Sequence, residues 1–253
     1  MEWKVMSFNL RTETQKDGIN NFPNRCRSIL EMLRRESPDL IGFQEATDFI
    51  RSWLRDSLGD EYFVLGCGRN ANYRGESVCI GFRRRMFELI SFDTRFFSLE
   101  PQRPGSRHAW SDQSACPRMF VHAALSCEGA AGPIHFFNTH LDHRGEIARE
   151  VELAQLLQEV SVCGGAFVLT GDFNAEPETA VASMPLQLHG RPVCEPTAEL
   201  AETFHGYGTI HGCKIDYIYT DGHPVSAYAV EDPHPDGIYL SDHFPICAVI
   251  DFA

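Results

Sequence analysis

The stretch Phe167-Val168-Leu169-Thr170-Gly171-Asp172-Phe173-Asn174-Ala175 decides how this sequence is interpreted. Its first half is a continuous apolar run, which is typical of a buried β-strand. The run reaches a glycine and then presents an acid and an amide on one side, with Phe173 between them pointing the other way. A strand needs neither polar group for its core. The stretch therefore predicts a polar site at the end of a buried strand.

Short apolar runs like this one recur along the chain, which has 253 residues and 43% hydrophobic content. Ten more are predicted as strands: 3–10, 40–44, 63–65, 77–82, 88–91, 120–126, 134–139, 215–219, 227–230 and 246–252. Three segments carry one apolar stripe at helical spacing: 24–36, 49–58 and 146–160. One-sided helices beside many strands indicate an α/β fold with much antiparallel pairing, whose sheets are covered on their outer faces. No repeat or linker interrupts the chain, so we expect a single domain, 1–253.

The bulk composition narrows the classes of protein. No stretch approaches the roughly 20 apolar residues of a membrane span, and the N-terminus has no charged-then-apolar leader. Nine cysteines form an odd number without the spacing of zinc or redox pairs. We therefore expect reduced thiols in a cytoplasmic protein that binds no membrane.

The charge is strongly acidic, with a formal net charge of −13 and lysine only at positions 4, 16 and 214. Duplex nucleic acid is held largely by neutralising many phosphates, so we expect no stable complex with duplex DNA. Several arginines nevertheless fall between residues 69 and 118. They are either part of a solvated surface or a local patch that faces phosphate, and the sequence leaves both open.

Polar residues end six of the predicted strands or lie within them. Each has an ordinary explanation alone, since an Asn at a strand end forms turns and a Glu there begins helices. Burying so many acids together without a cation would be too costly. Oxygen ligands with few imidazoles and no thiolate suit Mg²⁺ or Mn²⁺. The clusters contain Asn9, then Gln44 and Glu45, then His140 to His143, then Asp172 and Asn174, then Asp216, then Asp242 and His243.

This series resembles the endonuclease/exonuclease/phosphatase (DNase I-like) superfamily, in order from residue 6 to residue 249. The motifs that carry the resemblance are Phe8-Asn9, Gln44-Glu45, Thr139-His140, Gly171-Asp172-Phe173-Asn174, Ile215-Asp216-Tyr217 and Ser241-Asp242-His243. The resemblance implies a four-layer αββα sandwich, two packed and mostly antiparallel sheets with outer helices. It also implies a Mg²⁺- or Mn²⁺-dependent phosphoesterase.

The resemblance also implies roles for single residues. Glu45 would be the main metal ligand, with Asn9 and Asp242 completing or supporting the metal shell. Asp172 would orient or deprotonate the attacking water. Asn174 would hold a phosphoryl oxygen.

The two histidines of the series would act beside these groups. His243 would pair with Asp216, which fixes its tautomer. His140 would stabilise or protonate the phosphoryl oxygens. The stretch 74–83 looks like a strand whose glutamate braces that histidine, so Glu76 is expected to hold His140. We expect Arg118 to meet the scissile phosphate.

Further stretches resemble an uncharacterised bacterial branch of the superfamily: 66–69, 75–76, 104–106 with Trp110 and Arg118, and 138–143. Phe97-Ser98-Leu99 departs from a Trp-Leu-Ser turn of that branch, which leaves the substrate wall open. Arg69 and His143 join Arg118 as expected substrate-binding residues. Alternatively, His143 and Asp142 cap the helix that starts near Glu146.

The leading hypothesis is hydrolysis of a phosphomonoester or phosphodiester by a monomer. The sequence does not assign the substrate, which is expected to be a phosphorylated small molecule or a short nucleic acid. A nuclease acting on short or single-stranded nucleic acid is the first alternative, since Tyr73 and Trp110 either stack bases or belong to the core. A catalytically inactive binding module of the same fold is the second. Inositol polyphosphate 5-phosphatase motifs are absent from the sequence.

Overall fold

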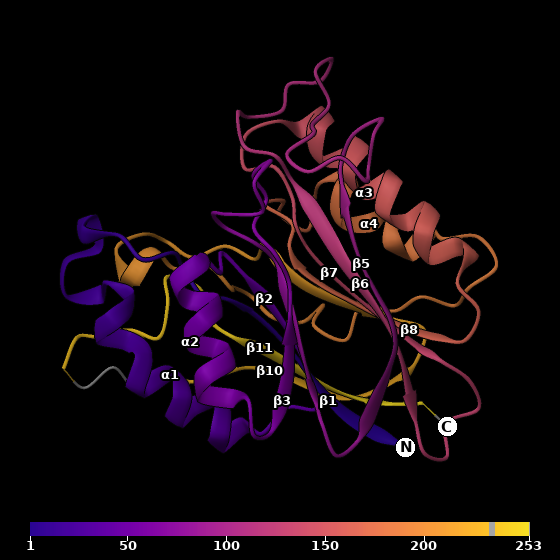
Figure 1. The fold of residues 1–253 in the computed structure, drawn as a ribbon, viewed down its shortest axis with the longest axis horizontal. Helices are drawn as coiled ribbons and strands as arrows, with labels where there is room; N and C mark the ends of the chain where they lie inside the picture. Colours follow the sequence, from indigo (N-terminus) through magenta and orange to yellow (C-terminus); the bar gives the residue numbers. More distant parts are fainter. Residues whose placement is uncertain (233–235, 253) are drawn as a thin grey trace.

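The computed structural model describes residues 1–232 and 236–252, and within them eleven strands form two sheets (Figure 1). The first sheet contains β1 (Glu2–Asn9), β2 (Leu40–Gln44), β3 (Tyr62–Leu65), β4 (Cys79–Arg83), β10 (His223–Ala229) and β11 (Ile246–Asp251). The second contains β5 (Phe87–Phe96), β6 (Met119–Cys127), β7 (Ile134–His140), β8 (Ala166–Asp172) and β9 (Asp216–Thr220). The strand order is β10-β11-β1-β2-β4-β3 in the first sheet and β5-β6-β7-β8-β9 in the second.

Pairing in both sheets is mixed, with antiparallel pairs prevailing. Only β1 with β2 and β7 with β8 are parallel among the described strand pairs. Each parallel pair is joined through a helix, as a parallel connection requires. These two helices are α1 (Phe22–Glu36) and α3 (Glu146–Val162). The parallel pairs bring the carboxyl ends of four strands to one end of the molecule.

The apolar residues fall into three layers, and this confirms the predicted four-layer sandwich. One core lies between the sheets and includes Val5, Ile80, Val121 and Val168. A second lies between the first sheet and the helices α1 and α2 (Asp48–Leu58). A third lies between the second sheet and α3 with the short α4 (Ala180–Ser183). Figure 1 shows these helices on the two outer faces of the sheet pair.

The predicted element boundaries hold to within a few residues, with two informative exceptions. Strand β5 has ten residues instead of the predicted four, because it pairs with β6 from Phe87 opposite Cys127 to Phe96 opposite Met119. Helix α4 and the 3-10 turns η1 (Gln15–Asn20), η2 (Pro185–Gln187) and η3 (Gly206–Gly208) were not predicted. They are too short to show a periodic pattern.

The two sheets approach closely beneath the polar end, at Gly42. A Cβ atom on Gly42 would lie 2.0 Å from Thr170 Oγ1 and 2.6 Å from Asn138 Oδ1, so only glycine fits there. Asn138 crosses between the sheets, donating to the carbonyls of Phe43 and Cys79 at 2.8 Å each. Buried polar groups that are satisfied in this way fix one arrangement of the sheets.

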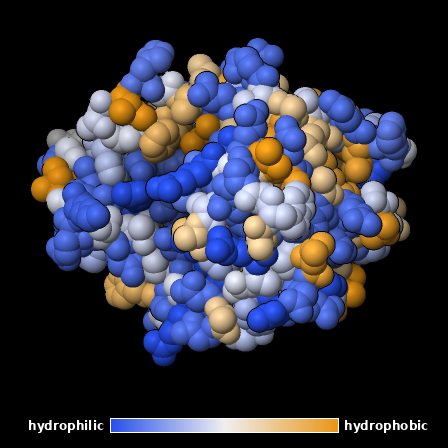
Figure 2. All heavy atoms as spheres, turned by 90° about the horizontal axis from the view of Figure 1, so that it is seen from above, coloured by the Kyte–Doolittle hydropathy of each residue, from blue (hydrophilic) through white to orange (hydrophobic). Residues whose placement is uncertain are grey.

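The cysteines, the helices and one face of the surface can now be compared with the expectations from composition. All nine cysteines are free. No helix in residues 1–232 and 236–252 is long and apolar enough to cross a membrane. Figure 2 shows one face of the molecule as mainly hydrophilic, with hydrophobic residues in separate small groups. That face offers no wide apolar patch of the kind that marks protein or membrane contacts.

Candidate active site

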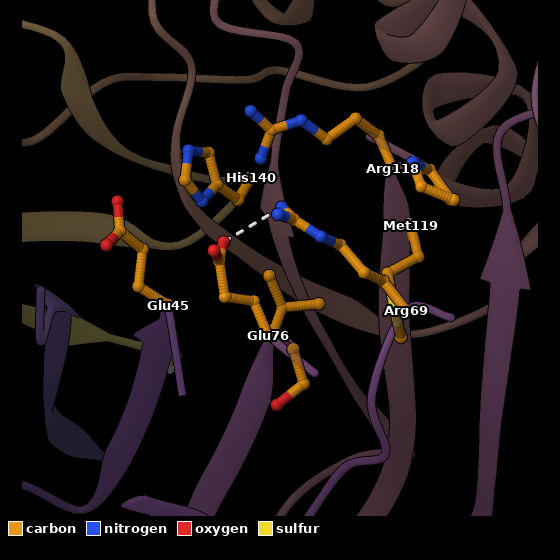
Figure 3. Close-up of a pocket in the computed structure, with 9 residues that line it drawn as sticks. Glu45, Arg69, Glu76, Arg118, Met119 and His140 are labelled. Carbon is orange, nitrogen blue, oxygen red and sulfur yellow. Dashed lines mark ion pairs between the residues drawn. The ribbon is translucent and has the colours of Figure 1, made fainter. Parts of the chain in front are cut away.

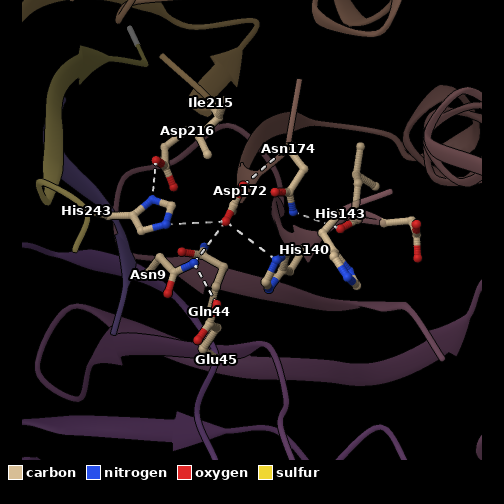
Figure 4. A network of polar contacts seen from close by, with 12 residues as sticks. Asn9, Gln44, Glu45, His140, His143, Asp172, Asn174, Ile215, Asp216 and His243 are labelled. Carbon is tan, nitrogen blue, oxygen red and sulfur yellow. Dashed lines mark hydrogen bonds and ion pairs between the residues drawn. The ribbon is translucent and has the colours of Figure 1, made fainter. Parts of the chain in front are cut away.

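The predicted site residues converge at one end of the sandwich, where strands from both sheets stop. Asn9 ends β1, Glu45 follows β2, and His140 and Asp172 end β7 and β8. Asp216 begins β9, while Asp242 and His243 precede β11. Figure 4 shows Asn9, His140 and His243 pointing toward Asp172, with Asp216 on the far side of the His243 ring. The chain termini lie at the other end (Figure 1).

Asp172 is the centre of this arrangement. Its Oδ2 atom accepts a hydrogen bond from Asn9 Nδ2 at 2.9 Å. The same oxygen lies 3.5 Å from His140 Nε2 and 3.9 Å from His243 Nε2. Its Oδ1 accepts from the backbone N–H of Asn174 at 2.9 Å, and Asn174 has a positive φ of 49°. Such backbone strain at a non-glycine residue is typical of functional sites.

His243 is held by Asp216, as the resemblance implied. The Nδ1 of His243 lies 2.8 Å from Asp216 Oδ2, which also accepts from the hydroxyl of Thr203 at 2.7 Å. Burial lowers the pKa of His243, but the charges of Asp216 and Asp172 and the Asp216 hydrogen bond outweigh it and raise this pKa to about 10. The imidazole is therefore a cation at neutral pH, with Nε2 facing Asp172.

Asp172 in turn has a pKa raised to about 7, by burial first and then by the charge of Asp216, against the opposing effect of cationic His243. A carboxylate tuned to neutral pH is suited to accept a proton.

Glu45, Asn9 and Asp242 form an oxygen-rich group beside this network. Glu45 has a positive φ of 57°, and its Oε2 accepts from the backbone N–H of Thr12 at 2.9 Å. Its Oε1 lies 3.4 Å from Asn9 Nδ2. Burial raises the pKa of Asp242, and the charge of Glu45 raises it further. Two acids that repel each other beside an amide are a donor set that suits a hard divalent cation.

A second group of possible ligands is Asp172, Asp216 and His243, whose donor atoms all lie within 4.8 Å of one another. Their bonding argues against a metal there. A protonated imidazole has no lone pair to offer, and its Nδ1 already meets Asp216. In this arrangement the three residues are suited to proton transfer, and the Glu45 group has oxygen donors that suit a hard divalent cation.

The expected bracing of His140 by Glu76 is wrong. The carboxylate of Glu76 pairs with Arg69 instead, with Nη1 and Oε2 2.9 Å apart, as Figure 3 shows. The physical reason is charge. A full guanidinium cation attracts a half-buried carboxylate more strongly than a neutral imidazole does. Glu76 lies three residues before β4 in the pocket lining, where the N–H of Arg69 also donates to its carbonyl at 2.8 Å.

His140 therefore has a different environment from His243. Burial lowers its pKa well below the ordinary value, and the charges of Arg118, Arg69, His243 and His143 lower it further. Arg118 is only 4% exposed. Glu45, Glu76, Arg69, Arg118 and His140 line one pocket (Figure 3). His140 is a neutral imidazole facing an anion-attracting wall.

Asp142 and His143 divide the two roles that the sequence left open. The Oδ1 of Asp142 accepts from the backbone N–H groups of Arg144 and Gly145 at 2.9 Å each, so Asp142 organises the turn that starts α3. The Nδ1 of His143 lies 3.0 Å from Arg118 Nη2 and extends the anion-attracting wall. Asp142 therefore takes the helix-capping role, and His143 lies beside Arg118 of the pocket wall.

Comparison with known proteins agrees with this geometry. The model of the Endonuclease/Exonuclease/phosphatase family matches residues 6–243, a span that reaches from β1 to His243. The chain belongs to this family. A curated relative, the uncharacterized protein L388 of Acanthamoeba polyphaga mimivirus, is 24% identical over 186 residues, which cover 68% of this chain and 67% of that protein.

Solved structures show the same fold throughout. A family member from Bacteroides vulgatus matches with a TM-score of 0.91 and 24% identity over all of both chains. A mannosyl-6-phosphatase from Bacteroides thetaiotaomicron matches with a TM-score of 0.87 and 22% identity, over 99% of this chain and 100% of that one. TDP2 of D. rerio, complexed with a single-strand DNA product, matches with a TM-score of 0.76 and 16% identity over 99% of each chain.

Sequence reasoning missed two residues that support this family site. Arg25 of α1 is fully buried and donates to the carbonyls of Leu10 and Leu240 at 2.7 Å each and of Arg11 at 2.8 Å. It thereby ties the chain just after Asn9 to the chain just before Asp242. An arginine three residues after Phe22, on the apolar side of a helix, was the available signal. Thr203, which holds Asp216, gave none.

Proposed function

We propose that this chain is a divalent-metal-dependent hydrolase that cleaves a phosphoester with an activated water. The observation that carries the proposal is the position of Asp172. One carboxylate oxygen faces Asn9 from the proposed metal-binding group, the cationic ring of His243 and the neutral ring of His140. A base, an acid and anion-binding groups around one point are what phosphoester hydrolysis requires.

Glu45, Asn9 and Asp242 would hold the ion, and their oxygen donors fit Mg²⁺ or Mn²⁺. The ion would supply charge stabilisation of the phosphoryl group and a lower pKa of bound water. Thr12 and Arg11 keep this group in place from the backbone. The N–H of Thr12 meets Glu45, and the N–H of Arg11 donates to Asn9 Oδ1 at 2.9 Å.

The protein's own residues would divide the remaining work. Asp172 accepts the proton of the attacking water, and the imidazolium of His243 keeps that carboxylate oriented. Asn174 turns its amide toward the carbonyl of Leu141 at 3.1 Å, and we propose that it swings to a phosphoryl oxygen when substrate binds. His140, being neutral, can donate a hydrogen bond to a phosphoryl oxygen.

We propose that the substrate is a phosphorylated small molecule, bound by a protein that is monomeric and cytoplasmic. Among the residues that line the pocket, the cationic side chains are Arg69 and Arg118, and His143 lies beside Arg118. That is enough to bind one or two phosphate groups and little more. The mannosyl-6-phosphatase of Bacteroides thetaiotaomicron shows that this fold can act on a sugar phosphate.

Short single-stranded nucleic acid is the second candidate. Tyr73 and Trp110 are 53% and 59% exposed, so neither belongs to the core and both are available for stacking. The structure of TDP2 holds single-strand DNA product on the same fold. Against long duplex, the net charge of −13 predicts weak binding at physiological salt. Tight, steeply salt-dependent binding to duplex DNA of random sequence would contradict this prediction and favour the nuclease function.

Turnover of a substrate panel with Mg²⁺ or Mn²⁺ tests the proposal. The panel contains sugar phosphates, nucleotides, phospholipid headgroups and oligonucleotides. Glu45→Gln should weaken metal binding by more than the roughly 10–100-fold that loss of an outer-shell partner costs, and should abolish most turnover. The matched control is Glu13→Gln, an acid outside the oxygen-rich group. Full turnover in excess chelator would refute metal dependence.

A further inference from the structure

A second cluster of metal-ligating side chains lies on the outer face of the second sheet, away from the active site. His122 of β6 is paired in register with Phe137 of β7, and His135 lies two residues before Phe137 on the same face. Cys163 directly follows the end of α3. His135 and His140 are five residues apart on one strand, so the cluster lies roughly 16 Å from the catalytic histidine.

The three donor atoms are close together. One nitrogen of each histidine and the sulfur of Cys163 all lie within 4.8 Å of one another. The Nε2 of His122 and the Nδ1 of His135 are 2.9 Å apart. Tetrahedral zinc, with Zn–N of about 2.0–2.1 Å and Zn–S of about 2.3 Å, needs ligand atoms roughly 3.3–3.6 Å apart. Side-chain movements of about an ångström would reach that geometry.

A hydrogen bond and ring packing fix the orientation of the two histidine rings in this cluster. The far nitrogen of His135, Nε2, lies 2.7 Å from the carbonyl oxygen of Gly164 and must be the protonated one. Its Nδ1 therefore carries a lone pair. A backbone carbonyl that orients a histidine in this way is the usual outer partner of a metal ligand. The ring of His122 stacks flat on Phe137, with centroids 4.2 Å apart and planes 3° apart.

The segment that carries Cys163 is also anchored. Arg191 donates from Nη1 to the carbonyls of Cys163 at 2.9 Å and Val160 at 3.2 Å. The thiol itself donates to the carbonyl of Glu159 at 3.3 Å, so a rotation about one bond frees the sulfur.

We propose that His122, His135 and Cys163 form a binding site for a transition-metal ion of the Zn²⁺ type, separate from the oxygen-rich active-site group. Two imidazoles and a thiolate select zinc, cobalt or copper over Mg²⁺. Coordination would release the thiol proton to solvent and leave the sulfur as thiolate. The ring proton of His122 would move from Nε2, where it now bonds to His135 Nδ1, to Nδ1, so that both facing nitrogens offer lone pairs. All three residues are partly exposed, which gives the ion an entry path and leaves the fourth position to water.

Co²⁺ titration in excess Mg²⁺ tests this proposal directly, because cobalt bound to thiolate absorbs in the near ultraviolet whereas oxygen-bound cobalt lacks that band. We expect one equivalent of Co²⁺ to produce the band and Zn²⁺ to abolish it. Cys163→Ser should remove the band. Cys194→Ser is the matched control and should keep it, since Cys194 is also half-buried and donates to backbone carbonyls.

Two further measurements keep the test decisive. His135→Gln should weaken Co²⁺ binding more than the roughly 10–100-fold typical of outer-shell losses, and His122→Gln should do the same. Zn²⁺ should raise the thermal midpoint of the wild type but not of these variants, and circular dichroism checks that each variant folds. Absence of the band in the wild type, or its persistence in Cys163→Ser, would overturn the proposal.

Discussion

The two halves of the active site give the same side chain different protonation states, a cation at His243 and a neutral ring at His140. On one side, Asp216 holds His243 at 2.8 Å and raises the pKa of its ring to about 10. On the other, burial and the arginines Arg69 and Arg118 lower the pKa of His140 well below its ordinary value. Both rings face the same carboxylate oxygen of Asp172.

This difference shows how one site can hold a cationic imidazole, His243, and a neutral hydrogen-bond donor, His140, at the same pH. A nearby carboxylate favours the charged imidazole, whereas burial and like charges favour the neutral one. The side with His243 balances the negative charge of Asp172. The side with His140 leaves its positive charge on the arginines, where a phosphate would meet it.

The largest expected effect is the loss of either histidine. His140→Gln and His243→Gln should each lower kcat/KM roughly 10²–10⁴-fold, because positioned acid–base groups contribute about that much. The double variant should lose less than the product of the two losses, because both rings act through Asp172. Steady-state kinetics on the best panel substrate measures this. A strictly multiplicative double variant would show that the two halves act independently.

The next effect concerns the Asp216 anchor. Asp216→Asn should lower kcat roughly 10–100-fold, as outer partners commonly do. The pKa of His243 should fall, because the cation loses its main partner, so activity should decline at a lower pH than in the wild type. The pH profile of kcat measures this. Thr203→Val removes only a hydroxyl from the same carboxylate and should shift the profile less. An unchanged pH profile in Asp216→Asn would show that Asp216 does not set the protonation state of His243, and would contradict the difference between the two histidines.

The opposite half gives a smaller effect. Glu76→Gln removes the partner of Arg69 and should change KM several-fold while leaving the pH profile of His140 in place, since Glu76 does not hold that ring. Arg69→Gln should raise KM more, by roughly tenfold, because a charge-assisted contact to phosphate is lost. If kcat of Glu76→Gln falls as far as that of Asp216→Asn, Glu76 does brace His140 after all.

The smallest effect on activity, with a measurable effect on stability, comes from Glu152 on α3. Burial raises its pKa to about 8, although the N–H of Asp142 donates to its Oε2 at 2.8 Å. A carboxyl whose pKa is raised on folding destabilises the protein as pH rises from about 4.5 to about 8. Glu152→Gln should therefore raise the thermal midpoint at pH 8.5 and change it little at pH 4.5. Equal midpoints at both pH values would show that Glu152 ionises freely.

Much of the fold could be predicted from local patterns. Each apolar run that ends in a polar pair became a strand that ends at the site, because a buried strand carries such groups only at its exposed end. The amphipathic stripes of α1, α2 and α3 likewise predicted helices on the outer faces. The predicted strand lengths were wrong where pairing with a neighbouring strand decides them. An example is β5, whose polar middle is held in the sheet by β6.

The sequence by itself determined the chemical types at the site and their order along the chain, since motif residues are fixed by their strand ends. Only the tertiary structure decided which groups meet. It placed Glu76 against Arg69 rather than His140, made one histidine cationic and the other neutral, and brought His122, His135 and Cys163 together. Partner choice and protonation depend on distance and burial, which sequence separation does not encode.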